Sequence, residues 1–248
     1  MKLKEVFDQL TYGELSQLAI GGRDAGAIAP QNYNRLVAHI NLGLTALYKR
    51  FQLKEGNITV ELQSNRLVYP LHSKYAVSSR SSRESVRYIK DSTAAPFKDD
   101  LLKIKRVVGT TGVEFPLNDL GDPYTMLTPT STTLTVPQAI AAPTAELEEQ
   151  LRTATLKIAY QANHPMIVTD DGDLDLELVE IELPYTHLEP LLLFVASRVH
   201  TPAGMTNEAN MGNTYYQRYE LACQEIETKN LTVDQGSQED RASRNGWV

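Results

Sequence analysis

Cysteine is nearly missing from this sequence of 248 residues, because Cys223 is the only one. A single thiol excludes a disulfide within the chain and favours synthesis in a reducing compartment. Long hydrophobic runs are missing too. The longest apolar stretch is residues 191–196, whereas a helix needs about 20 apolar residues to span a bilayer. We therefore expect no membrane span, and residues 1–5 do not resemble the start of a secretory signal.

Sequence signatures of catalysis and metal binding are also scarce. The five histidines show neither HxxxH nor HExxH spacing, and no Gly-x-Ser-x-Gly motif occurs. The acidic run 170–175 resembles a calcium-binding loop in its carboxylate spacing, but Leu176 stands where that loop needs glycine. We therefore interpret the run as a solvated acidic hairpin and expect no enzyme, no metal and no cofactor. A metal-assisted hydrolase that uses these aspartates is the alternative.

Helical periodicity is clear in the first 53 residues. Residues 3–10 carry an apolar stripe, and Thr11 with Glu14 matches a capping box, which predicts that a new helix starts at Thr11. Pro30 is typical of a first helical turn, and residues 30–51 keep one apolar face for four turns.

Helical signals return near the C-terminus. A second capping box, at Thr186 and Glu189, predicts a helix over 191–199. A long helix is expected over 207–229, followed by a polar tail over 230–248.

The middle of the chain alternates apolar and polar residues, as half-buried β-strands do. The Thr-rich stretch 128–133 is expected to be an exposed loop or an edge strand. Strands are predicted near 58–62 and 156–162. A hairpin is predicted from 101–108 and 113–117, with its turn at Gly109–Gly112. A further strand is predicted over 174–183, with a one-residue bulge near Leu178 and Val179.

Together these patterns predict an α+β fold, because short amphipathic helices before and after a strand block need each other for burial. The N- and C-terminal helices would form an antiparallel helical bundle from 1–53 and 186–229. Residues 54–185 would be an inserted antiparallel β-rich domain, and residues 230–248 an extended C-terminal arm.

The net charge of −7 argues against a dedicated nucleic-acid binder, but charge is unevenly distributed. Residues 66–106 hold ten Lys and Arg against four acids, whereas residues 170–189 hold eight acids and no Lys or Arg. Both patches are expected on the β-rich domain, and we predict that they pair between neighbouring subunits of a ring. One alternative is that both patches only face solvent. Another is that the stretch Ser78–Arg83 contacts nucleic acid. The candidate subunit-interface residues are Arg80, Arg83, Arg87, Lys90, Asp171, Asp173, Asp175 and Glu177.

The only tryptophan, Trp247, stands in the polar C-terminal tail. Tryptophan is enriched among residues that anchor protein interfaces, so the tail is predicted to bind a partner. A tail that folds back on its own subunit is the alternative.

Two stretches of the sequence carry a family resemblance. The first joins Leu10–Ser16 with Ile40–Phe51, and the second joins Tyr219–Ile226 with Asn230–Leu231 and the terminal Asn-Gly-Trp-Val. In these stretches, which cover under half of the chain, the sequence resembles the head-to-tail adaptor proteins of short-tailed bacteriophages.

The resemblance implies a structural virion protein, located in the neck and made in the host cytoplasm. Its copies would form a ring, of twelve in that family, beneath the portal protein. That ring would close the DNA-filled head, attach the tail nozzle and fibres, and let genomic DNA through its lumen without sequence-specific binding. A tail-tube or nozzle component is the alternative. The candidate portal-binding residues are Arg241, Arg244, Asn245, Gly246, Trp247 and Val248.

Overall fold

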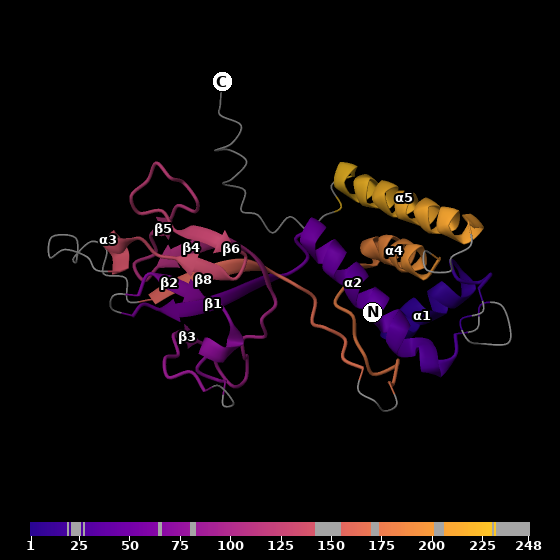
Figure 1. Cartoon of the computed structure of the whole chain (residues 1–248), viewed down its shortest axis with the longest axis horizontal. Helices are drawn as coiled ribbons and strands as arrows, with labels where there is room; N and C mark the ends of the chain where they lie inside the picture. Colours follow the sequence, from indigo (N-terminus) through magenta and orange to yellow (C-terminus); the bar gives the residue numbers. More distant parts are fainter. Residues whose placement is uncertain are drawn as a thin grey trace, which may run out of the picture. The chain divides into compact units, whose positions relative to one another are not determined.

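The computed structural model shows an α+β protein built from packed helices and antiparallel sheets (Figure 1). Contacts divide the chain into two compact units. We call Met1–Leu53 with His164–Val248 the helical unit, and Lys54–Asn163 the β unit. The structure describes residues 1–18, 20, 26, 28–63, 66–79, 83–141, 155–169, 174–200, 206–229 and 231, with the backbone alone for 206–209.

The first helix of the helical unit, α1, spans Leu3–Tyr12 and buries the predicted apolar stripe. The helix start predicted at Thr11 is wrong, because Thr11 lies in the last turn of α1 and residues 13–17 form turns. Gly13 ends α1, and its N–H group donates a hydrogen bond to the carbonyl of Gln9 at 2.8 Å. The chain therefore leaves the helix at the glycine rather than restarting at the threonine.

The other three predicted helices are confirmed: α2 spans Tyr33–Arg50, α4 spans Leu188–His200 and α5 spans Thr206–Thr228. Helix α4 contacts α1, α2 and α5, and Figure 1 shows it between α5 and the other two. Residues 191–197 are all buried, as expected for a helix surrounded by others. None of the helices in the described ranges is long and apolar enough to cross a membrane.

Gly43 allows α2 to approach α4 closely. A Cβ atom at this position would lie 2.8 Å from Cδ1 of Leu191 and 3.0 Å from Cδ1 of Phe194. Such distances are shorter than van der Waals contact, so a larger residue here would push the two helices apart.

The described residues of 164–169 and 174–185 pack against the helices, although the sequence predicts them as part of the β-rich domain. The Asn41 side chain of α2 bonds both backbone groups of Ile167, with N–O distances of 2.9 and 3.0 Å. The Tyr48 hydroxyl, also on α2, donates a hydrogen bond to the carbonyl of Glu182. The β unit therefore ends at Asn163, and this segment belongs to the helical unit.

The bulged strand predicted over 174–183 is wrong. Residues 176–178 form a turn, and the N–H group of Leu3 donates to the carbonyl of Val179 at 2.9 Å. The backbone of this segment thus bonds to the start of α1 instead of to a sheet. Leu178, which alternation placed on a buried face, is 77% exposed.

The β unit contains a five-stranded sheet in the order β3-β1-β8-β4-β5 and a three-stranded sheet in the order β2-β7-β6, with antiparallel neighbours throughout. The strands are β1 (Glu55–Glu61), β2 (Val68–Pro70), β3 (Ile89–Lys90), β4 (Leu101–Gly109), β5 (Glu114–Phe115), β6 (Leu127–Thr130), β7 (Thr133–Thr135) and β8 (Thr155–Ala162). The short helices are α3 (Gln138–Ala141), η1 (Pro30–Asn32), η2 (Ser73–Tyr75) and η3 (Tyr185–His187), of which α3 and η2 lie in the β unit.

Several strand predictions are confirmed. Alternate residues of β1 and β8 are buried in the core of the β unit, as the period of two requires. Strands β4 and β5 form the predicted hairpin, in which Gly112 has a φ of +86°, a conformation that favours glycine. The Thr-rich stretch includes β6, an edge strand of the smaller sheet.

Candidate functional site

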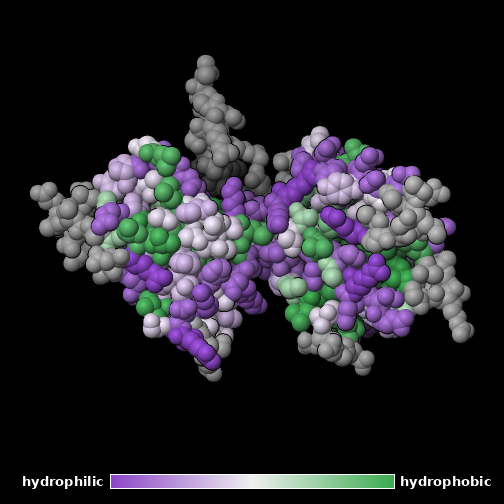
Figure 2. Space-filling view, viewed as in Figure 1, coloured by the Kyte–Doolittle hydropathy of each residue, from purple (hydrophilic) through white to green (hydrophobic). Residues whose placement is uncertain are grey.

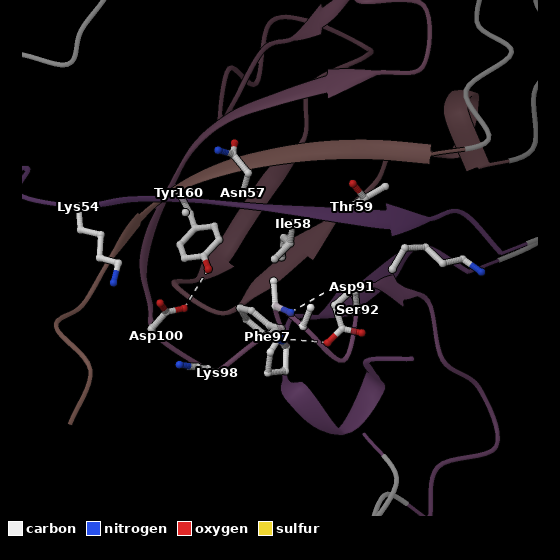
Figure 3. A pocket seen from close by; sticks show the side chains of 15 residues that line it. Lys54, Asn57, Ile58, Thr59, Asp91, Ser92, Phe97, Lys98, Asp100 and Tyr160 are labelled. Carbon is white, nitrogen blue, oxygen red and sulfur yellow. Dashed lines mark hydrogen bonds between the residues drawn. The ribbon is translucent and has the colours of Figure 1, made fainter. Parts of the chain in front are cut away.

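A cleft of about 690 Å³ opens in the β unit beside the first half of β1. Its other wall is the loop of residues 91–100, which follows β3, and Tyr160 of β8 contributes to its lining. Figure 3 shows the labelled side chains around this cleft.

The base of the cleft depends on a pairing between Gly56 of β1 and Tyr160 of β8, which are cross-strand partners. A Cβ atom at Gly56 would lie 2.3 Å from Cζ of Tyr160, so the tyrosine ring occupies space that only glycine leaves open. The Tyr160 hydroxyl donates to Oδ1 of Asp100 at 2.9 Å (Figure 3). Burial, followed by the negative charge of Asp100, raises the pKa of Tyr160. The phenol therefore stays protonated and anchors the end of the loop.

Asp91 shapes the other end of the loop. Its carboxylate accepts hydrogen bonds from the N–H group of Ser78 at 2.8 Å, from the N–H group of Phe97 at 3.0 Å and from the Ser78 hydroxyl. Burial alone would raise the pKa of Asp91, but these donors outweigh burial and hold the pKa below its ordinary value. Asp91 is thus an ionised, structural carboxylate that joins the loop to Ser78.

Three lysines, Lys54, Lys90 and Lys98, line the cleft together with the two aspartates already described. The ammonium group of Lys90 pairs with Glu61 at 2.7 Å. Figure 3 shows Lys54 and Lys98 at the end of the cleft where Asp100 lies. Both aspartates accept hydrogen bonds from neutral donors and keep their negative charge, so the cleft lining carries ammonium and carboxylate groups together.

No pattern in the sequence points to this cleft. Of the predicted interface residues, Lys90 lines it, whereas Arg83 and Arg87 belong to the same unit outside its lining. Arg80 lies outside the described residues. No single motif could have located the cleft, because Gly56 and Tyr160 meet only through the pairing of two strands that are distant in sequence.

Of the predicted acidic interface residues, Asp175 and Glu177 lie in the helical unit and not in the β unit, which corrects the expectation that they share one domain with the basic patch. Oδ1 of Asp175 accepts a hydrogen bond from the N–H group of Glu177 at 2.9 Å. The Glu177 carboxylate pairs with Lys4 of α1 at 2.7 Å. Asp171 and Asp173 lie outside the described residues, as do all the predicted portal-binding residues (Arg241, Arg244, Asn245, Gly246, Trp247 and Val248).

Within the described residues, no group of three or more His, Cys, Asp or Glu side chains is arranged to hold a metal ion. The sequence matches no model of a known protein family, and a comparison with characterised proteins gives no match either.

Proposed function

We propose that this protein is a head-to-tail adaptor of a short-tailed bacteriophage, a structural virion protein that acts by binding. Its copies form a ring beneath the portal protein, the C-terminal arm binds the portal, and the outer surface receives the tail nozzle and fibres. Genomic DNA passes through the lumen of the ring without sequence-specific contacts.

The observation that supports this proposal best is a contact between the two stretches that carry the family resemblance. Arg50, at the end of the first stretch, donates from Nη1 to Oε2 of Glu220 in the second, at 2.6 Å. A further contact links the neighbourhoods of both stretches, because the Tyr215 hydroxyl donates to the carbonyl of Glu14 at 3.1 Å. Segments about 170 positions apart thus form one helical unit, as expected if the resemblance reflects a shared core.

The charge of the two units also supports a ring. Residues 54–163 hold 13 Lys and Arg against 12 acids, whereas the rest of the chain holds 11 against 19. A ring of identical copies needs two different faces that complement each other. The β unit is nearly neutral as a whole, but its stretch 66–106 holds ten Lys and Arg against four acids, and pairing of that stretch with the acidic helical unit of the next copy would satisfy the requirement.

Exposed apolar side chains give a second reason to expect assembly. Met166, Val168, Leu178 and Tyr185 are each at least 68% exposed, and all four lie on the segment that covers the helices. Figure 2 shows apolar surface among polar surface on the helical unit. Exposed apolar side chains on this segment are available for contact with a partner protein or with another copy.

The proposal is tested by mixing the purified protein with the portal protein of the same phage. We expect a ring-shaped complex by electron microscopy and co-sedimentation. Deleting Asn245–Val248, or changing Trp247→Ala, should abolish the complex while the circular dichroism spectrum stays unchanged. Undiminished portal binding by both variants would remove the proposed role of the arm. Binding to nozzle or fibre proteins but not to portal would favour the tail-tube alternative.

A further inference from the structure

Helices α2 and α4 pack against each other in opposite directions. Phe51 follows the end of α2 and His187 precedes the start of α4, and their rings are in contact with centroids 4.7 Å apart. Further back along α2, a Cβ atom at Gly43 would lie 3.0 Å from Cδ1 of Phe194. The start of α2 therefore lies beside the end of α4.

One helical turn beyond this contact, His39 and Arg198 come together. His39 precedes Gly43 by four residues and Arg198 follows Phe194 by four, so both continue the faces that meet. Arg35 lies one further turn toward the start of α2. Burial lowers the pKa of His39, and the positive charges of Arg35 and Arg198 lower it further, so both guanidinium groups are near the ring.

The two arginines of this cluster have no counter-ion among the described residues. Both side chains are exposed, and no described carboxylate lies within salt-bridge distance of either one. The guanidinium group of Arg198 lies over the Phe194 ring, 5.1 Å from its centroid, a contact that does not use its N–H donors. The cluster is thus positively charged, although the helical unit as a whole holds 11 Lys and Arg against 19 acids.

The histidine of the cluster also lacks a partner in the described chain. Both of its ring nitrogens are buried, and neither has a hydrogen-bond partner among the described residues. Buried polar atoms are nearly always hydrogen-bonded, so an unsatisfied one calls for a water molecule or an ion. Between two guanidinium groups, that ion has to be an anion.

We propose that Arg35, His39 and Arg198 bind a phosphate group. A phosphate offers at least two unesterified oxygens and carries negative charge, and the planar guanidinium group matches its geometry. A free phosphate, with up to two charges, can accept hydrogen bonds from both arginines and from the imidazole at once. A carboxylate has only two oxygens, which one arginine can occupy alone.

The arginine side chains control access to the buried ring. Their stems are long and flexible, so both groups can turn toward an anion and uncover the imidazole nitrogens. The inference goes beyond the adaptor proposal and does not depend on it, because it concerns the surface of α2 and α4 and not the C-terminal arm.

Nuclear magnetic resonance of the histidine side chains in the full-length protein tests the site. The His39 signal is assigned with the His39→Gln variant, and sodium phosphate is then titrated at constant ionic strength against sodium chloride. We expect phosphate to shift the His39 signal. Phosphate should also raise the pKa of His39 toward its ordinary value of 6.5, because the anion offsets the two positive charges. The signal of His72, in the β unit, should not move.

Two variants and a matched control locate the binding. Arg35→Gln and Arg198→Gln should each weaken phosphate binding about tenfold, since each removes charged hydrogen-bond donors. Arg83→Gln removes the same charge from an exposed arginine of the β unit and should leave the affinity unchanged. All three positions are exposed, so the circular dichroism spectrum should stay that of the wild-type protein.

The pH dependence gives a readout that a general effect of charge would not. If anion binding raises the pKa of His39, protonation of His39 must strengthen anion binding to the same extent. Sulfate keeps its two charges between about pH 8 and pH 6, so its affinity should rise over that range in the wild-type protein and not in His39→Gln. A short DNA duplex that shifts the His39 signal and competes with phosphate would identify a nucleic-acid backbone as the source of the phosphate group. Phosphate binding that the duplex leaves unchanged would identify free phosphate.

The proposal would be overturned by a His39 signal that phosphate does not shift more than chloride does. Equal affinities of the wild-type, Arg35→Gln and Arg198→Gln proteins would overturn it as well. Failure of portal binding would leave these results unaffected, so the two proposals can fail separately.

Discussion

Arg50, the last residue of α2, holds Glu227 of α5 through two hydrogen bonds. The Nε–Oε1 distance is 2.7 Å and the Nη2–Oε2 distance is 3.3 Å, an arrangement that matches the planar guanidinium to the carboxylate. The bond to Glu227 is the main reason that the pKa of Arg50 is raised, and the bond to Arg50 lowers the pKa of Glu227. Together with Glu220, this pair fixes the end of α2 against α5.

Changing Arg50→Ala should therefore destabilise the helical unit. The Arg50 side chain is 23% exposed and holds two carboxylates, so we expect a loss of roughly 1–2 kcal/mol in the free energy of unfolding. Urea unfolding followed by circular dichroism at the helical band measures the change. Lys229→Ala, which removes an exposed pair with Glu225, is the control and should have little effect. Equal effects of the two changes would show that Arg50 does not join the helices.

The close approach of Gly56 and Tyr160 leads to a second prediction. Gly56→Val should displace the tyrosine ring, break its bond to Asp100 and destabilise the β unit by about 1–3 kcal/mol. Gly121→Ala is the control, because a Cβ atom there meets only the Oδ1 atom of Asp119, at 3.3 Å. Thermal unfolding distinguishes the two variants. A Gly56→Val protein as stable as the Gly121→Ala protein would contradict the described base of the cleft.

The thiol of Cys223 should be an internal reporter for the helical unit. It is fully buried, and burial raises its pKa to about 11. Ellman's reagent should therefore react slowly with the native protein and rapidly with the protein unfolded in urea. Arg50→Ala should speed the native reaction, because Cys223 lies on the same helix as Glu220 and Glu227. Rapid labelling of the native wild-type protein would show that α5 does not stay packed.

The helices and the main strands could be predicted from sequence because their signals are local. The apolar stripe of α2 and the alternation around Ile58 and Ile158 each lie within one element. Local patterns fail where a segment gains its partners from elsewhere. Alternation over 174–183 resembled a strand, but the backbone there bonds to the start of α1.

The cleft could not be predicted for a related reason. It requires Gly56 and Tyr160 to be cross-strand partners and β3 to be too short to cover β1. Both conditions are properties of strand pairing, and neither residue stands in a motif. Lys90 belongs to a basic stretch of the sequence, and such a stretch does not distinguish a residue that lines a cleft from one that faces solvent.

Three histidines of the helical unit have buried ring nitrogens without a hydrogen-bond partner among the described residues. These atoms are both ring nitrogens of His39, both of His200 and the Nε2 atom of His187. Burial lowers the pKa of His39 and of His187, and the positive charges of Arg35 and Arg198 lower that of His39 further. The folded state therefore favours the neutral forms of His39 and His187.

Acidification should consequently weaken the helical unit. A histidine whose folded pKa is lowered stabilises the fold fully above its ordinary pKa of 6.5, and that contribution is lost as pH falls toward the folded value. The urea midpoint should thus drop between about pH 7.5 and pH 5. His187→Phe, which keeps the ring contact with Phe51 but cannot titrate, should reduce the drop. His72→Asn, in the β unit, is the control and should show the same drop in the urea midpoint as the wild-type protein. A drop of the same size in all three proteins would show that the acid sensitivity has another source.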